Sequence, residues 1–286
     1  MSRRGCGVRT LAAVTPLGLI AGQGTFPLLV AEGARAAGRP VRCVGIGDLP
    51  DPRLPGLCDD YRRLGLLQVG RWARHLGTPE AIMVGRVDHK LLHGRLRYLQ
   101  FLPDPATVGI LWRIRRDKRP AAVLNGVADA LRERGVTLID STAYSREHLA
   151  TAGTMTRRAP TPAEAEDVAH GWEVARQLSR LDVGQCLAIR EKNVLAVEAV
   201  EGTAAMITRA GALSRGSPWT LVKVGNTHHD MRFDVPCVGT DTIQQLADAG
   251  CRCLAVAAGR TMLLDRPKVL AAADAAGIAV VGRDDE

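Results

Sequence analysis

The 286-residue chain has few aromatic residues and no long apolar run. Aromatic residues make up only 3% of it, so leucine, valine and alanine must fill the interior. Charges, glycines or prolines interrupt every apolar run well before the ~20 residues that span a bilayer, which excludes a polytopic membrane protein. A hydrophobic share of 46% still supports substantial cores, and the length fits one large domain or two ordinary ones.

Paired-cysteine motifs are also missing. The seven cysteines are an odd number, and no two of them have the C-x-x-C spacing. This pattern excludes a disulfide scaffold and gives no support for a zinc site. It predicts a reducing compartment, so we expect a cytoplasmic protein.

Charge is unbalanced towards the basic side. Lys and Arg number 38 against 30 Asp and Glu, which gives a net charge of +8. Such an excess favours nucleic acid, anionic lipid surfaces or phosphorylated small molecules as partners. RNP-like aromatics, a zinc-finger spacing and a basic-zipper heptad are all absent, so we expect no nucleic-acid binding. The densest basic run, residues 113–119, fits either a solvated helix face or a surface for an acidic membrane or a nucleotide phosphate.

Short apolar runs alternate with helical patterns in the first half of the chain. The predicted strands are Leu17–Ala21, Val41–Ile46, Ala81–Val84 and Val136–Asp140, and the predicted helices are Pro27–Ala37 and Ala121–Arg134. Strand–helix alternation predicts a parallel sheet covered by helices on both faces. We therefore expect a Rossmann-like domain over residues 1–150.

The alternation of apolar runs and helical patterns stops at residues 151–163. This segment has no periodicity and contains Pro160 and Pro162, which predicts a linker between domains. Thr161 and Glu164 have the spacing of a capping box, which predicts that a helix begins here and continues to about Arg180.

The remainder of the chain again contains both predicted strands and predicted helices. The predicted strands are Cys186–Ile189, Val194–Glu198, Trp219–Val224, Leu254–Val256 and Ala279–Val281, and the predicted helices are Ala204–Leu213, Asp241–Ala249 and Pro267–Ala276. The fold class is therefore α/β, with two α/β domains joined by a Pro-containing linker. The second domain, residues 164–286, is expected to be catalytic.

A glycine-containing turn is the first candidate site. Gly22, Gln23 and Gly24 end the first strand, and glycines between a strand and a helix let backbone N–H groups approach a phosphate. Pro27 stands where the G-x-G-x-x-G fingerprint requires its third glycine, which argues against an NAD site. The turn either contacts a phosphate or ribose, or serves only the fold.

A second candidate joins an apolar strand to the next helix. Glu201, Gly202 and Thr203 lie at this junction, where Thr203 can cap the helix while neighbouring N–H groups face an anion. The alternative is a plain helix cap.

The third candidate is the segment Asp230–Pro236. If it is extended, Asp230, Arg232 and Asp234 point to one side of the strand. A carboxylate here can bind Mg²⁺ or Mn²⁺ and orient a water, and the arginine can hold a phosphate oxygen. The alternative is a row of surface ion pairs on an edge strand.

With these segments in view, the chain resembles the UDP-2,3-diacylglucosamine pyrophosphatase family of lipid A biosynthesis. This is the two-domain type, unrelated to the calcineurin-like phosphoesterases that perform the same step. The matching segments are residues 17–24, 156–160, 181–185, 194–203, 230–236 and 258–266. They occur in the family's order and span nearly the whole chain.

The resemblance implies hydrolysis of UDP-2,3-diacylglucosamine to UMP and a lipid 1-phosphate with the help of Mg or Mn. It implies catalytic roles for Asp234 and Arg232, with Asp234 as the metal ligand. The other implied substrate-binding residues are Gly22, Gln23, Gly24, Asp182, Gln185, Glu201, Gly202, Thr203, Asp230 and Arg260. An amphiphilic substrate and a basic chain also imply peripheral contact with the anionic surface of the inner membrane, and a homodimer is left open.

Several positions depart from the family's pattern. Ala204 and Ala257 replace a usual Asp and Glu, and residues 119–121 replace a usual Gly-Asp-Asp. A catalytically weakened homologue that binds a sugar nucleotide or lipid and has a regulatory role is therefore the alternative.

Overall fold

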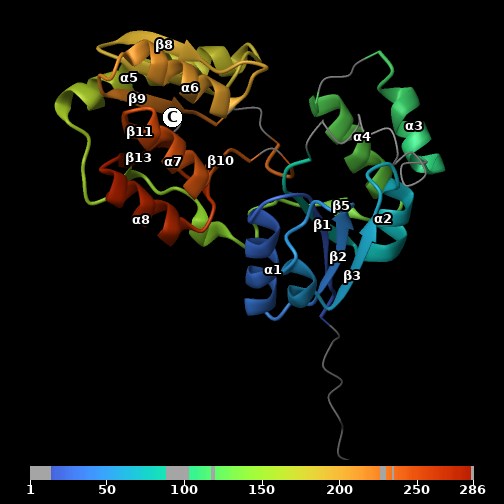
Figure 1. Ribbon diagram of the computed structural model, residues 1–286. Coiled ribbons are helices and arrows are strands. Elements are labelled where there is room, and N and C mark those ends of the chain that lie inside the picture. The colour runs from blue at the N-terminus through green and yellow to red at the C-terminus, as the bar shows by residue number, and fades with distance from the viewer. Residues whose placement is uncertain (1–13, 88–102, 117–119, 226–229, 234, 285–286) are drawn as a thin grey trace, which may run out of the picture. The chain divides into compact units, whose positions relative to one another are not determined.

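Two separate sheets organise the chain. The computed structural model describes residues 14–87, 103–116, 120–225, 230–233 and 235–284 (Figure 1). It divides into unit 1, Met1–Leu138, and unit 2, Ile139–Glu286.

Unit 1 is built on a five-stranded sheet. Its strands are β1 (Leu17–Ala21), β2 (Val41–Ile46), β3 (Asp60–Leu64), β4 (Glu80–Val84) and β5 (Thr137–Leu138). They follow the order β3-β2-β1-β4-β5, and all the pairings are parallel. The order reverses beside β1, which is buried along its whole length. The carboxyl ends of β1 and β4 therefore form the switch point where open parallel sheets bind ligands.

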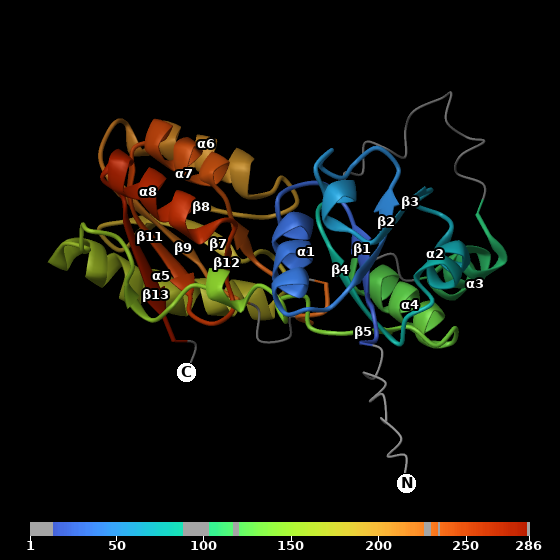
Figure 2. The same cartoon turned by 90° about the horizontal axis from the view of Figure 1, so that it is seen from below.

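Helices cover both faces of this sheet. The helices against the sheet are α1 (Phe26–Ala36), α2 (Val69–Leu76) and α4 (Pro120–Arg132). Helix α3 (Pro105–Arg113) packs on α2 and α4, and the 3₁₀ turn η1 (Leu54–Leu57) packs on α1. Figures 1 and 2 show α1 on one face and α2 with α4 on the other. The alternation of apolar runs predicted this arrangement, although β3, α2 and α3 were not among the predicted elements.

Unit 2 is built on a six-stranded mixed sheet. Its order is β6-β13-β11-β9-β7-β8, and β9, β11 and β13 are parallel while β6, β7 and β8 pair antiparallel. The strands are β6 (Gly153–Thr154), β7 (Cys186–Arg190), β8 (Asn193–Val197), β9 (Trp219–Lys223), β11 (Cys251–Ala257) and β13 (Ala279–Arg283). A separate short ladder pairs β10 (Cys237–Val238) with β12 (Met262–Leu263).

Two apolar clusters lie on the two faces of this sheet. Helix α5 (Pro162–Arg180) packs Val168, Trp172 and Ala175 against one face. Helices α6 (Thr203–Ser214), α7 (Thr240–Asp248) and α8 (Arg266–Ala276) cover the other face. Both units are thus mixed α/β, as predicted.

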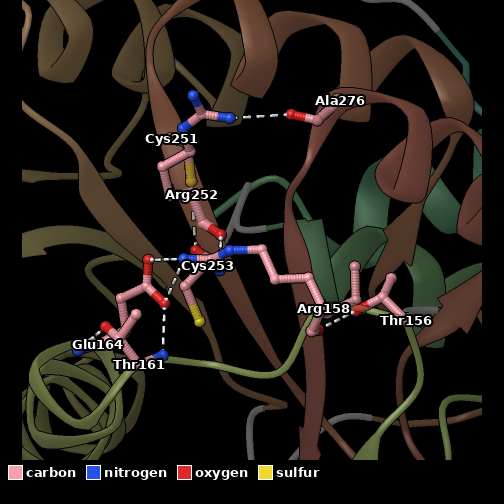
Figure 3. A network of polar contacts seen from close by, with 9 residues as sticks. Thr156, Arg158, Thr161, Glu164, Cys251, Arg252, Cys253 and Ala276 are labelled. Atoms are coloured by element: carbon pink, nitrogen blue, oxygen red, sulfur yellow. Dashed lines mark hydrogen bonds and ion pairs between the residues drawn. The ribbon is translucent and has the colours of Figure 1, made fainter.

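Residues 151–163, the segment expected to be a linker, make backbone and side-chain contacts with unit 2. Gly153 and Thr154 form β6 against β13, and the Met155 N–H donates to the Val280 carbonyl at 2.9 Å. The Arg158 guanidinium reaches both oxygens of Glu164 at 2.7 and 2.9 Å (Figure 3). The segment lacks periodicity because its partners are distant in sequence. The chain divides into its two units between Leu138 and Ile139.

The predicted capping box is present at the start of α5. The Thr161 hydroxyl accepts from the Glu164 N–H at 3.2 Å, and the Glu164 carboxylate accepts from the Thr161 N–H at 2.8 Å. Figure 3 shows the same Glu164 carboxylate bound by Arg158, whose guanidinium also donates to the Arg252 carbonyl at 2.9 Å. One carboxylate thus fixes both the helix start and the preceding segment.

Candidate functional site

Most of the unit 2 candidates flank one edge of its sheet. The parallel strands β9 and β11 end at this edge, at Lys223 and Ala257. Antiparallel β7 begins there, because Cys186 pairs with Lys223, and β8 ends there beside β7. The candidates next to these strand ends are Asp182, Gln185, Glu201, Gly202, Thr203 and Arg260. The carboxyl edge of parallel strands is where open α/β sheets bind ligands.

A buried polar cluster lies at this edge, on the sheet face that α6 covers. Neighbouring strands place Lys223, Cys186 and Glu198 side by side, since the Glu198 N–H donates to the Cys186 carbonyl at 2.9 Å. Lys223 is 5% exposed and Glu198 is 8% exposed. The Lys223 ammonium donates to the Cys186 sulfur at 3.4 Å, and the Thr203 hydroxyl donates to Glu198 Oε1 at 2.5 Å. Within the described part of the chain, buried Glu198 Oε2 has no hydrogen-bond partner.

Burial and neighbouring charges set the protonation of this cluster. Burial raises the pKa of Cys186 to about 12, so the thiol is protonated at neutral pH. Burial by itself would lower the pKa of Lys223, but the neighbouring Cys186 and Glu198 raise it, and the net shift is upward. Lys223 is therefore a buried cation near the Glu198 carboxylate, and Glu198 holds Thr203 at the start of α6 through the Thr203 hydroxyl.

The first turn of α6 faces the same edge. Its cap residue is Gly202, whose φ of +81° is in the region that favours glycine. Gly202 has no side chain with which to cap this turn, and Thr203, the cap expected from the sequence, is instead the first helical residue, with its hydroxyl donating to Glu198. The N–H groups of an uncapped first turn are suited to bind an anion.

Gly184 allows the cluster to form. A Cβ on Gly184 would overlap the Glu198 carbonyl oxygen, so the chain entering β7 can pass Glu198 only without a side chain. Gly184→Ala is expected to lower the free energy of unfolding by about 1–3 kcal/mol, because backbone atoms must move apart. Urea unfolding measures this change. Gly56→Ala is the control, since a Cβ there meets no atom within 4 Å, and equal losses in the two variants would contradict the prediction.

The remaining edge residues have more exposed positions. Asp182 is exposed in the turn after α5, with a φ of +58°. The Glu201 carboxylate accepts from Arg209 at 2.6 Å, and the Gln185 carbonyl accepts from the Val224 N–H at 3.0 Å. Arg260 follows β11 and lies along Gly225, where an added Cβ would be 3.2 Å from its Cδ.

The strand expected at Asp230–Pro236 is wrong for its first part. Residues Met231–Phe233 form a turn, in which the Phe233 N–H donates to the Asp230 carbonyl at 3.1 Å. The Asp230 carboxylate accepts from the Arg232 backbone N–H at 3.1 Å and from its Nε at 2.8 Å. An aspartate that bonds the backbone two residues ahead favours a turn over a strand. Asp234 lies outside the described residues, so its role stays a prediction.

Arg232 also neutralises the negative charge of Asp230 in this turn. Its guanidinium, hydrogen-bonded to the Asp230 carboxylate, lowers the pKa of Asp230. The Met231 carbonyl accepts from the Ser141 hydroxyl at 2.7 Å, which ties the turn to the rest of unit 2. Asp230 and Arg232 are thus held together as a neutral pair.

The expected metal site is not formed by these residues alone. Across the described ranges, no three His, Cys, Asp or Glu side chains gather closely enough to hold a metal ion. The Asp230 carboxylate is already bound by Arg232. Asp234, the expected metal ligand, lies outside these ranges, so dependence on Mg or Mn stays a prediction.

The glycine-containing turn of unit 1 is tightly packed. A Cβ on Gly22 would lie 2.8 Å from the backbone of Gly85 and Arg86, and a Cβ on Gly85 would lie 2.7 Å from Gly22. Gln23 and Arg86 exchange two backbone hydrogen bonds, each of 2.9 Å. Gly24 has a φ of +106° and a free Cβ direction. The contact between strand ends requires Gly22, and the exposed Gln23 and Gly24 remain available to a ligand.

Comparison with known proteins covers both units. Residues 16–148 match the LpxI N-terminal domain, and residues 151–281 match the LpxI C-terminal domain. The UDP-2,3-diacylglucosamine pyrophosphatase LpxI of Caulobacter vibrioides is 32% identical over 281 residues, which cover 94% of this chain and 97% of that protein. The chain belongs to the LpxI family. Membership in the LpxI family confirms the resemblance found in the sequence.

Two solved structures show only a distant similarity to the LpxI-family chain. A biotin carboxylase subunit of pyruvate carboxylase matches at 14% identity and a TM-score of 0.26, covering 64% of this chain and 35% of that one. A biotin carboxylase domain of a single-chain bacterial carboxylase matches at 16% identity and a TM-score of 0.19, covering 70% and 55%. Scores this low carry no argument about fold or function.

Sequence analysis of this LpxI-family chain missed Lys223, Cys186 and Glu198 as a group. One signal was present, because Lys223 is the only charged residue in the otherwise apolar or small strand Trp219–Lys223. A lysine inside a buried strand requires a partner. Its partner could not be named, because Cys186 and Glu198 reach it only through pairing between strands that are distant in the sequence.

Proposed function

We propose that this chain hydrolyses the pyrophosphate bond of UDP-2,3-diacylglucosamine in lipid A synthesis, releasing UMP and 2,3-diacylglucosamine 1-phosphate. The observation that carries the proposal is the 32% identity, over nearly the full length of both chains, to a protein named for this activity. The sheet edge of unit 2 supports it, because the groups there suit a phosphorylated substrate.

Phosphate binding is the part of the reaction that the described residues support best. Cleavage of a pyrophosphate needs positive groups that neutralise the phosphoryl oxygens and a carboxylate that orients the attacking water. The uncapped first turn of α6 would supply N–H donors, with Arg260 from the same edge as a cation. Ala204 suits this role, since it leaves no acidic side chain in the first turn of α6.

The water-orienting group is proposed to be Asp234. It follows the Asp230–Arg232 turn, whose internal ion pair would keep the Arg232 guanidinium in one orientation toward a phosphoryl oxygen. Dependence on Mg or Mn is also proposed, from the family resemblance and from Asp234 as ligand. A divalent cation supplies charge neutralisation at phosphoryl oxygens.

Purified protein is expected to release UMP from UDP-2,3-diacylglucosamine with added Mg²⁺ or Mn²⁺, and to lose this activity with excess EDTA. Chromatography of the nucleotide product and mass spectrometry of the lipid product measure both halves of the reaction. An enzyme-free reaction with the same metal is the control. If the protein binds the substrate without releasing UMP, the alternative of a binding homologue replaces the enzyme.

A lipid substrate lies in a membrane, so the protein must reach a membrane surface. We propose peripheral contact with the anionic cytoplasmic surface of the inner membrane, because the proposed substrate has two acyl chains. In the described ranges, no helix combines the length and apolarity needed to cross a bilayer.

A further inference from the structure

Helix α3 of unit 1 has an apolar face that is exposed in the part of the chain that the structure describes. Val108, Leu111 and Trp112 have helical i, i+3, i+4 spacing and are 51%, 46% and 66% exposed. Single exposed apolar residues are ordinary, but three on one face of a short helix, including a tryptophan, require an explanation.

The opposite face of α3 already anchors the helix in unit 1. Ala106, Thr107 and Ile110 are buried, and the Thr107 hydroxyl accepts from the Val69 N–H at 3.2 Å. Ile110 packs against Gly126 of α4, where an added Cβ would lie 3.0 Å from its side chain. The outer face is therefore not needed to hold α3 in place.

Arginines border the outer face. The Arg115 guanidinium lies over the Trp112 ring, 4.2 Å from its centroid, and also donates to the Trp112 carbonyl at 2.8 Å. Arg115 and Arg116 are exposed, and in the part of the chain that the structure describes neither forms an ion pair, whereas Arg113 pairs with Glu133 at 2.9 Å. The basic run at residues 113–119 was predicted as a solvated helix face or an anion surface. Because α3 ends at Arg113, most of this run follows the helix.

We propose that the outer face of α3, with Arg115 and Arg116, docks this protein onto an anionic lipid bilayer. Tryptophan and leucine enter the boundary between head groups and acyl chains, and arginine keeps its charge among the head groups. The charge complementarity favours anionic lipid over an apolar protein groove, since unpaired arginines beside an apolar groove would lose solvent without gaining a partner. The exposed apolar residues and arginines define this surface by themselves, and only its use in reaching a lipid substrate rests on the proposed function.

Tryptophan fluorescence offers a direct test, because the chain has four tryptophans and only Trp112 is exposed. Trp72, Trp172 and Trp219 are buried. Full-length protein is mixed with phosphatidylcholine vesicles that contain phosphatidylglycerol, with ordinary or brominated acyl chains. Emission is expected to shift to the blue, and brominated chains are expected to quench it. Trp112→Phe should still sediment with these vesicles but lose the quenching.

Two double variants test the two parts of the surface. Leu111→Ser with Trp112→Ser is expected to weaken vesicle partitioning at least about tenfold, because the apolar anchors are removed. Arg115→Gln with Arg116→Gln should weaken it about fivefold per charge at low salt, and this difference should shrink as salt rises. Leu213→Ser, at a half-exposed leucine of α6, is the matched control and should bind like the unaltered protein. Circular dichroism checks that each variant is folded.

Three results would overturn the proposal. One is that the folded serine variant binds vesicles as well as the unaltered protein does. Another is sedimentation with brominated vesicles without quenching of Trp112, which would place the membrane contact elsewhere. The third is a blue shift that depends on protein concentration without vesicles, which would identify a second copy as the occupant.

Failure of docking can be separated from failure of the proposed function. The serine variant should hydrolyse UDP-2,3-diacylglucosamine in detergent micelles at the normal rate, because α3 is not among the proposed substrate-binding residues. Vesicle binding without any hydrolysis would support the surface and reject the enzyme.

Discussion

Asp234→Ala is expected to lower kcat for UMP release by at least about 10²–10³, the usual loss when one transition-state electrostatic group is removed. Binding should change far less, because it depends on uridine, phosphate and acyl contacts made by many other residues. Single-turnover kinetics with UDP-2,3-diacylglucosamine measure the chemical step, and calorimetry with the substrate measures binding.

Controls for this prediction come from other aspartates of unit 2. Asp241→Ala, at an exposed position in the first turn of α7, should leave kcat unchanged. Asp230→Ala should have a smaller effect than Asp234→Ala, because the Asp230 carboxylate is already bound by Arg232. A fully active Asp234→Ala protein would reject this segment as the catalytic centre. If the alanine variant loses its fold, the nearly isosteric Asp234→Asn decides the question.

The second large effect is expected on stability. Lys223→Ala should lower the free energy of unfolding by about 3 kcal/mol, since it leaves the Glu198 carboxylate buried without a compensating cation. Urea unfolding followed by circular dichroism measures the loss. Lys192→Ala is the matched control, because Lys192 forms an exposed ion pair with Glu166, and such pairs are worth about 0–1 kcal/mol.

A double variant separates charge from packing in this cluster. Replacing both charges, in Lys223→Met with Glu198→Gln, should recover most of the stability lost in Lys223→Ala, because no uncompensated charge remains. Recovery of stability without recovery of kcat/KM would assign the pair to positioning of the α6 first turn. If Lys223→Ala is as stable as the unaltered protein, the cluster is not held by charge.

Local signals explain which elements could be predicted from the sequence. The strand Leu17–Ala21 is apolar throughout because it is buried on both faces, and the Thr161–Glu164 capping box involves residues three apart. Strand β3 was missed because it is an edge strand with charged side chains, where Asp60 pairs with Arg42 at 3.2 Å. Helix α3 was missed because both of its faces are apolar, so it shows no 3.6-residue periodicity.

The candidate site was predictable in part for the same reason. Glu201, Gly202 and Thr203 could be placed at a helix start because strand, glycine and helix follow one another in the sequence. The turn at Asp230 could not be told from a strand, since alternating polar and apolar residues also fit a turn closed by an aspartate side chain. The neighbourhood of Lys223 depends on register between distant strands, which a single sequence does not contain.

The contact between Gly22 and Gly85 has a consequence for the energetics of recognition in unit 1. Two strand ends that touch through their backbones, with paired hydrogen bonds between Gln23 and Arg86, leave this turn few alternative conformations. A ligand that contacts the exposed Gly24 beside this paired backbone meets a chain that is already immobilised, so little conformational entropy is lost on binding. Weak individual contacts made there can therefore contribute to affinity almost undiminished.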